Sequence, residues 1–152
     1  MRRFAMPAVL VFAGALALSG CAAGGGGDTA GSSEDNCTTV ATEVRDISNG
    51  VQNNIAAPAS VDDLKEYLDD AKSRAEDAAG EAESDDLESA VDDFAATLEG
   101  VSEYADGLTE GPSEEDPEAT VVEQDPDAQA EQQTAVQEAA VAVSDVCSSD
   151  EE

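Results

Sequence analysis

The stretch VDDLKEYLDDAKSRAEDAAGEA, residues 61–82, places a small or aliphatic residue at alternating steps of three and four. A repeat of this kind puts these residues on one face of an α-helix. Ser60, directly before the stretch, is a favoured N-cap, and Asp63 stands at the reciprocal capping position. Asp62 and Asp63 also bring negative charge to the positive first turn. The stretch therefore predicts an amphipathic helix that begins just after Ser60.

Three further segments carry the same period, with Asn36, Ser84 and Asp125 as candidate N-caps. Pro126, at the first helical position, supports the last of these helices. Their apolar positions are Cys37, Val40, Val44, Ile47 and Val51; Leu87, Val91, Phe94, Leu98, Val101, Ala105 and Leu108; and Val136, Ala139, Ala140, Val143 and Cys147. Aromatic residues, β-branched runs and period-two alternation are scarce, so strands find little support. The sequence predicts an all-α domain of four helices.

Two segments interrupt this pattern. Asn49-Gly50 lies inside the first predicted helix, which we expect it to bend or fray. Residues 109–124, between the third and fourth helices, are rich in Glu, Asp, Pro and Gly. We expect an exposed acidic loop there, which serves either as a spacer or as a partner-binding segment.

The start of the chain has the order of an export signal. Arg2 and Arg3 precede an apolar run from Pro7 to Leu18. The run is too short to cross a hydrocarbon core of about 30 Å, which takes about 20 residues, and suits a signal peptide. It ends in Leu18-Ser19-Gly20-Cys21, which resembles the lipobox of bacterial lipoproteins.

The resemblance to bacterial lipoproteins covers only about the first 21 residues. It implies cleavage before Cys21, attachment of a diacylglyceryl group to its sulfur, and acylation (palmitate-type) of the new amine. Two or three acyl chains hold a protein stably at a membrane, so we expect an exported protein anchored on the extracytoplasmic side. The alternatives are an ordinary signal peptide with a coincidental cysteine, and an uncleaved anchor. The acidic, Ala-, Gly- and Val-rich composition also resembles exported lipoproteins of the actinobacterial type.

If Cys21 carries lipid, Cys37 and Cys147 remain as a pair. An even pair in an exported chain predicts a disulfide. The alternatives are two free thiols or a metal pair, but the chain has no histidine and no CxxC motif. In four antiparallel helices, the start of the first and the end of the fourth share one end of the bundle. Three or five helices would place the two cysteines too far apart to bridge within about 7 Å.

The predicted architecture is therefore an up-down-up-down four-helix bundle closed by a Cys37–Cys147 disulfide. Its organisation along the chain is a signal peptide over residues 1–20, a flexible tether over 21–36, the four-helix domain over 37–147 and an acidic tail over 148–152.

The charge of the chain excludes several classes of partner. The sequence has 36 acidic and 6 basic residues, for a net charge of −30. Loss of Arg2 and Arg3 with the signal peptide leaves four basic residues against 36 acidic ones, a net charge of −32. Nucleic-acid binding needs a basic surface and is not expected. Docking on anionic headgroups is disfavoured for the same reason, so we expect contact with the membrane only through lipid on Cys21.

No set of residues predicts catalysis or a cofactor. Without histidine, neither a Ser-His-Asp triad nor the Glu-x-x-His di-iron pattern can form. Paired acids recur at Asp62-Asp63, Asp69-Asp70, Asp85-Asp86 and Asp92-Asp93. Neighbouring helical residues point about 100° apart, so these pairs indicate a solvated acidic face, with weak Ca²⁺ or Mg²⁺ binding as the alternative.

We therefore expect a non-enzymatic, lipid-anchored protein of the cell envelope that presents an acidic helical surface to an unknown partner. The alternative is an accessory lipoprotein of a transporter or sensor that binds a cation or a small ligand.

Overall fold

The computed structural model describes residues 30–113 and 118–149, with side chains from Asp35 onward. The predicted signal peptide, Cys21 and most of the predicted tether lie outside the described residues. The described chain is mostly helical, as predicted, and also holds a two-stranded sheet. Its elements are α1 (Ala30–Ala56), α2 (Val61–Glu81), α3 (Asp85–Asp106), β1 (Thr109–Pro112), β2 (Thr120–Glu123) and α4 (Pro126–Ser149).

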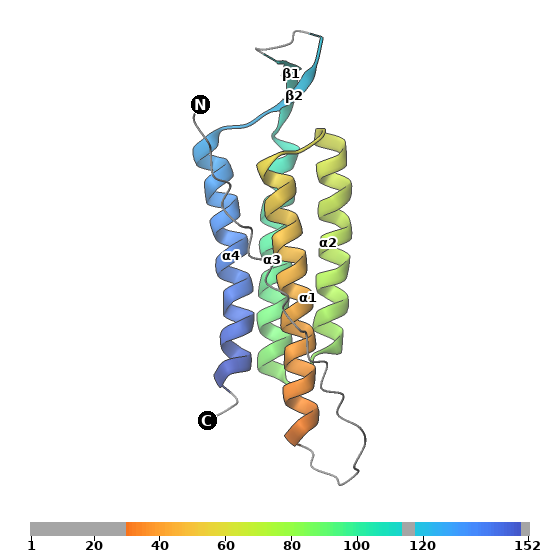
Figure 1. The fold of residues 1–152 in the computed structure, drawn as a ribbon, viewed down its shortest axis with the longest axis vertical. Helices are drawn as coiled ribbons and strands as arrows, with labels where there is room; N and C mark the ends of the chain where they lie inside the picture. The colour runs from red at the N-terminus through yellow and green to blue at the C-terminus, as the bar shows by residue number, and fades with distance from the viewer. Residues whose placement is uncertain (1–29, 114–117, 150–152) are drawn as a thin grey trace, which may run out of the picture.

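The four helices lie side by side, with the two strands beyond one end of them (Figure 1). Helix α1 packs against α2 and α4, and α3 packs against the same two helices. Each helix thus buries its apolar stripe against two neighbours, which is how a small helical domain hides its apolar surface.

The predicted helix boundaries around α2 and α3 are confirmed by their caps. The Oγ of Ser60 accepts the N–H of Asp63 at 3.0 Å, and the Oγ of Ser84 accepts the N–H of Leu87 at 3.3 Å. Asp125 does the same for α4, because its Oδ1 accepts two N–H groups of the first turn, each at 3.0 Å. These side chains satisfy backbone donors that have no partner within the helix.

Helix α1 begins at Ala30, so residues 30–36 of the predicted tether are helical. The prediction that Asn36 caps this helix is wrong, because Asn36 lies inside it. Its side chain is used between helices instead: the amide donates to the carbonyl of Glu81 at 2.8 Å, and its oxygen accepts the N–H of Glu83 at 3.0 Å. Asn36 thereby joins α1 to the connection between α2 and α3.

The interruption expected at Asn49-Gly50 does not occur, since α1 is continuous through Gly50. The reason is a tertiary contact. A Cβ at Gly50 would overlap the hydroxyl of Tyr67 on α2 and lie 2.9 Å from its Cζ, so the glycine makes room for the hydroxyl end of the tyrosine. The helix–helix contact that Gly50 permits outweighs its poor helix propensity of about 1 kcal/mol.

The core is formed mainly by α1, α2 and α3. The predicted stripes of these helices are buried almost throughout, with Phe94 and Ile47 among the largest buried side chains. Helix α4 contributes only Val136 and Val143 as fully buried residues within its described length, while its other apolar residues are half-buried or exposed. Helix α4 therefore contributes fewer buried side chains to the core than the other three helices do.

The described part of residues 109–124 is largely exposed, as predicted, but residues 109–112 and 120–123 form strands where a loop was expected. The two strands are antiparallel and registered from Thr109↔Glu123 to Pro112↔Thr120, so the all-α prediction is wrong at this point. The strands are four residues each and largely exposed, too short to give a period-two signal in the sequence. The β-branched run Thr120-Val121-Val122 favours the extended state locally.

The far C-terminus also differs slightly from the prediction. Ser148 and Ser149, assigned to the acidic tail, form the end of α4. Within the described ranges, the structure has no helix whose length and hydropathy would let it cross a bilayer.

Candidate functional site

Cys37 and Cys147 lie at disulfide-bonding distance, with their Cα atoms 5.5 Å apart. Cys37 stands in the first half of α1 and Cys147 in the last turn of α4. Cys37 is buried and Cys147 is half-buried. The structure therefore brings together the two cysteines that the sequence paired, whereas Cys21, the predicted lipid site, lies outside the described residues.

Three basic side chains are paired with carboxylates of neighbouring helices. Lys65 on α2 contacts Asp106 on α3 at 2.8 Å, and Lys72 on α2 contacts Glu99 on α3. Arg74 on the same helix reaches in the other direction and contacts Glu43 on α1. Helix α2 thus holds both of its neighbours through ion pairs. All three pairs are partly open to solvent, so each contributes little to stability.

These ion pairs also shift the pKa of side chains that form them. The hydrogen bond to Asp106 raises the pKa of Lys65, and the bond to Glu99 raises the pKa of Lys72. In return, the hydrogen bond and charge of Lys72 lower the pKa of Glu99. Three of the four basic residues outside the predicted signal peptide are thereby matched with internal acids.

The consequence is an acidic exterior. Arg45, the fourth of these basic residues, is exposed and forms no ion pair within the described part of the chain. Apart from Arg45 and the three paired cations, every charged side chain of the described helices is a carboxylate.

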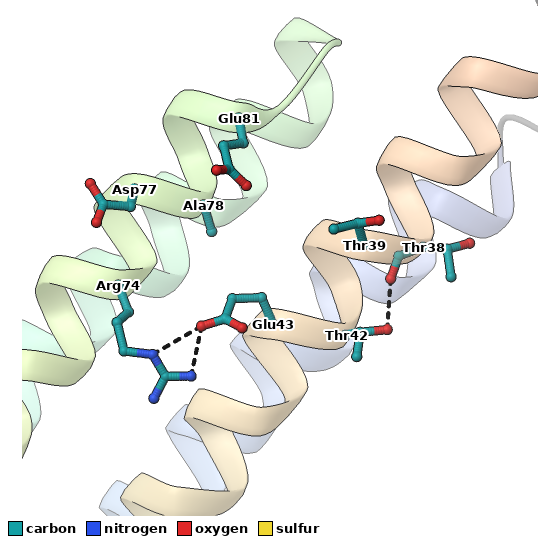
Figure 2. Close-up of a pocket in the computed structure, with 8 residues that line it drawn as sticks. All are labelled: Thr38, Thr39, Thr42, Glu43, Arg74, Asp77, Ala78 and Glu81. Atoms are coloured by element: carbon teal, nitrogen blue, oxygen red, sulfur yellow. Dashed lines mark hydrogen bonds and ion pairs between the residues drawn. The ribbon is translucent and has the colours of Figure 1, made fainter.

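A groove of about 570 Å³ runs between α1 and α2 (Figure 2). Arg74 spans it, and both its Nε and its Nη2 donate to Oε1 of Glu43, at 2.9 and 2.6 Å. Asp77 and Glu81 line the α2 side of the groove, so its carboxylates outnumber its one cation by three to one. The wall on α1 is formed by Thr38, Thr39 and Thr42.

The threonines of this groove are engaged with their own helix. Thr42 donates to the carbonyl of Thr38 at 2.7 Å, as Figure 2 shows, and Thr39 donates to the carbonyl of Asp35 at 2.8 Å. The groove is therefore open, polar and negatively charged, a chemistry that suits a cation or a basic side chain. The aspartate pairs named in the sequence do not converge on it. Among the described residues, no group of three or more metal-ligating side chains is placed to hold a metal ion.

A second feature, the strand pair, was missed by the sequence analysis. The backbone N–H of Val61 donates to Oε1 of Glu110 at 2.7 Å, and the hydroxyl of Tyr104 donates to Oε1 of Gln124 at 2.9 Å. These two bonds fix the strands over the ends of α2 and α3. Burial, followed by the charge of Asp125, raises the pKa of Tyr104. The β-branched run at 120–122 favours a strand and was the available signal in the sequence. Gly111 and Pro112, in the partner segment, are residue types that disfavour a strand.

Comparison of the chain with models of protein families, with curated proteins and with solved structures found no match.

Proposed function

We propose that this chain is a lipid-anchored, non-enzymatic protein of the bacterial cell envelope that presents an acidic helical surface to a protein partner. The lipid sits on Cys21, in the motif Leu18-Ser19-Gly20-Cys21. The acyl chains hold the protein on the extracytoplasmic side of the membrane, while its negative charge keeps the body away from anionic headgroups.

The body is an up-down-up-down four-helix bundle closed by a Cys37–Cys147 disulfide. The pairwise packing of α1 with α2 and α4, and of α3 with the same helices, supports this topology. So does the 5.5 Å between the Cα atoms of the two cysteines, one near the start of the first helix and one near the end of the last.

The observation that carries the proposed function is the placement of the basic residues. Lys65, Lys72 and Arg74 are each bound to one carboxylate of a neighbouring helix, so each offsets a single acidic side chain and leaves the other carboxylates uncompensated. The remaining carboxylates form a field that repels nucleic acid and anionic lipid and attracts basic protein surfaces.

Crosslinking in native membranes tests this function. A photocrosslinker placed at Glu103 on the exposed side of α3 should capture a discrete protein partner. The yield should fall when Asp92 and Asp93 on the same helix are changed to asparagine, and should fall with rising salt. Exchange of the exposed, uncharged Ser89 on the same helix for alanine serves as the matched control. Equal capture by the asparagine variant and the control would contradict a role for the acidic surface.

The groove between α1 and α2 favours a second candidate function, the binding of a cation or small ligand as an accessory of a transporter or sensor. Glu43, Asp77 and Glu81 all line it. Calorimetric titration with Ca²⁺, Mg²⁺ and Mn²⁺ separates the two functions. Stoichiometric binding in the micromolar range, lost in Asp77→Asn, would favour the second; weak binding without stoichiometry fits the first.

A further inference from the structure

The register of the strand pair determines which of its backbone groups are free. The N–H of Ser113 donates to the carbonyl of Ala119 at 2.8 Å, directly beyond the pair Pro112↔Thr120. In an antiparallel ladder, hydrogen-bonded and non-hydrogen-bonded pairs alternate. Pro112↔Thr120 is therefore a non-hydrogen-bonded pair, and so is Glu110↔Val122. The backbone groups of these four residues point away from the neighbouring strand.

The two outer edges of the sheet are consequently unequal. On β1, Pro112 has no N–H to offer, and the side chain of Glu110 is bound to the start of α2. On β2, Thr120 and Val122 each present both an N–H and a carbonyl. The β2 edge contains no proline and no lysine, two residues that often block an edge strand.

The side chains near this edge indicate the chemistry of a partner. Val121 is 43% exposed and offers an apolar contact beside the edge. Glu123 is exposed on the same strand, and no lysine or arginine occurs anywhere between Thr109 and Asp125. A strand that pairs here would meet negative charge and one aliphatic side chain, so charge complementarity calls for a basic, extended segment.

The position of the edge fits a partner that approaches from outside. The strands lie beyond the helix ends at which α1 finishes and α4 begins (Figure 1). Cys147 lies in the last turn of α4, near the opposite end. A protein held through residues preceding Cys37 would direct the strand pair away from its attachment.

We propose that the outer edge of β2, Thr120–Glu123, is a strand-addition site for an extended, basic segment of a partner protein. Thr120 and Val122 supply the main-chain hydrogen bonds, Val121 supplies an apolar contact, and Glu123 supplies charge. Recognition of this kind takes its affinity from main-chain bonds and its selectivity from alternate side chains. The inference rests on the proposed function, because it names where the acidic protein meets its partner.

The test uses the full mature chain and, as probe, a short synthetic peptide of alternating valine and lysine. NMR should show that the amides of Thr120 and Val122 gain protection from hydrogen exchange when the peptide binds. The amides of Val121 and Glu123, which already face β1, should change much less. A peptide of alternating valine and glutamate should not bind.

Thr120→Pro removes one free N–H at a position that the ladder does not use, where proline is tolerated. It should weaken binding about tenfold, the effect of one lost main-chain hydrogen bond, whereas Thr120→Ala keeps the N–H and should bind as the wild type does.

A valine–lysine peptide with N-methyl groups on alternate residues gives an independent result that does not depend on the variant's fold. Methylation of one set of alternate residues removes the N–H groups that face β2, and methylation of the other set removes those that face away. Only the first of these two peptides should fail to bind.

Each of three results with the peptide probes would overturn the proposal: no binding of the valine–lysine peptide, equal binding to Thr120→Pro and Thr120→Ala, or equal binding of all methylated and unmethylated peptides. The last two would assign the binding to charge alone. Crosslinking to a partner on α3 that is unaffected by Thr120→Pro would refute the edge but leave the proposed function standing. An unmodified Cys21 would refute the lipid anchor whatever the peptide does.

Discussion

Gly50 shows how a single residue sets the approach of two helices. The hydroxyl and the Cζ of Tyr67 occupy the space where a side chain at this position would begin. By contrast, a Cβ at Gly100 on α3 would meet nothing within 4 Å. The two glycines are alike in sequence context, since each lies inside a helix, but only Gly50 is required by packing.

Gly50→Ala is therefore expected to destabilise the protein, although alanine is the better helix former. Overpacking costs about 1–3 kcal/mol, which exceeds the gain of about 1 kcal/mol in helix propensity. Gly100→Ala, the matched control, should stabilise by about 0.5–1 kcal/mol. Urea unfolding measures both. If Gly50→Ala proved as stable as Gly100→Ala, the Tyr67 contact would not control this position.

Ionisation of Tyr104 should lower the stability of the fold as the pH becomes alkaline. Burial raises its pKa above the ordinary value of 10.0, so the unfolded chain loses the phenolic proton first as pH rises. The contribution of Tyr104 is complete below pH 10 and declines as pH rises from there towards the folded pKa. Its ionisation also removes the hydrogen bond to Gln124.

Unfolding by urea at several values above pH 9 should thus show a steeper loss of stability for the wild type than for Tyr104→Phe. The lysine pairs are common to both proteins, so their deprotonation cancels in the comparison. Parallel pH profiles for the two proteins would show that Tyr104 ionises equally well in the folded and the unfolded state.

At the scale of elements, α4 is the helix with the weakest hold on the core. It buries only Val136 and Val143 fully within its described length, and none of the three cross-helix ion pairs involves it. Two glutamine amides tie it to the end of α1: Gln129 donates to the carbonyl of Ile55 at 3.0 Å, and Gln133 donates to the carbonyl of Gln52 at 3.3 Å. The Cys37–Cys147 pair holds its other end.

Reduction of the disulfide should therefore loosen α4 before the other helices. A bridge between residues 110 apart restricts the unfolded chain by roughly 4–5 kcal/mol in the loop-closure model. Hydrogen exchange followed by mass spectrometry should show faster exchange in α4 than in α2 after reduction. The Cys37→Ser/Cys147→Ser protein should behave like the reduced one. Uniform exchange in both, or an unchanged melting temperature, would contradict this role.

The elements that the sequence predicted correctly are those whose signals are local. The capping serines at 60 and 84 and the stripes of α2 and α3 depend on neighbours within one helix; both caps were confirmed, and the stripes are buried almost throughout. The errors concern contacts between segments far apart in sequence. Asn36 finds its partners at Glu81 and Glu83, and Gly50 is explained by Tyr67; no local pattern contains this information.

The candidate sites divide in the same way. The cysteine pair could be deduced, because the number of helices and the chemistry of exported proteins both restrict it. The groove between α1 and α2 and the free edge of β2 could not be deduced from the sequence. The groove needs the relative rotation of two helices, and the edge needs the register of strands only four residues long.

For the whole molecule, repulsion between carboxylates opposes the compact state. The net charge is −30 for the full chain, and molar salt largely screens repulsion between exposed charges that lie more than about 3 Å apart. The three ion pairs are screened as well, but they are few and partly exposed, so the repulsive charges dominate.

The melting temperature should therefore rise between low and molar NaCl. Sodium chloride is preferred to sulfate, because sulfate would also strengthen the burial of apolar surface. An Asp92→Asn/Asp93→Asn variant carries less charge and should gain less from salt. A melting temperature that is independent of salt, or falls with it, would show that self-repulsion does not limit stability.

The central claim is that a stable acidic helical domain is held at the membrane by lipid on Cys21. Cys21→Ser tests it most directly, with partition between detergent and aqueous phases as the measurement. The account predicts that the wild type enters the detergent phase and that Cys21→Ser moves to the aqueous phase. The helical domains of the two proteins should melt at the same temperature. A Cys21→Ser protein that remains in the detergent phase would contradict the claim and identify the apolar run from Pro7 to Leu18 as the anchor.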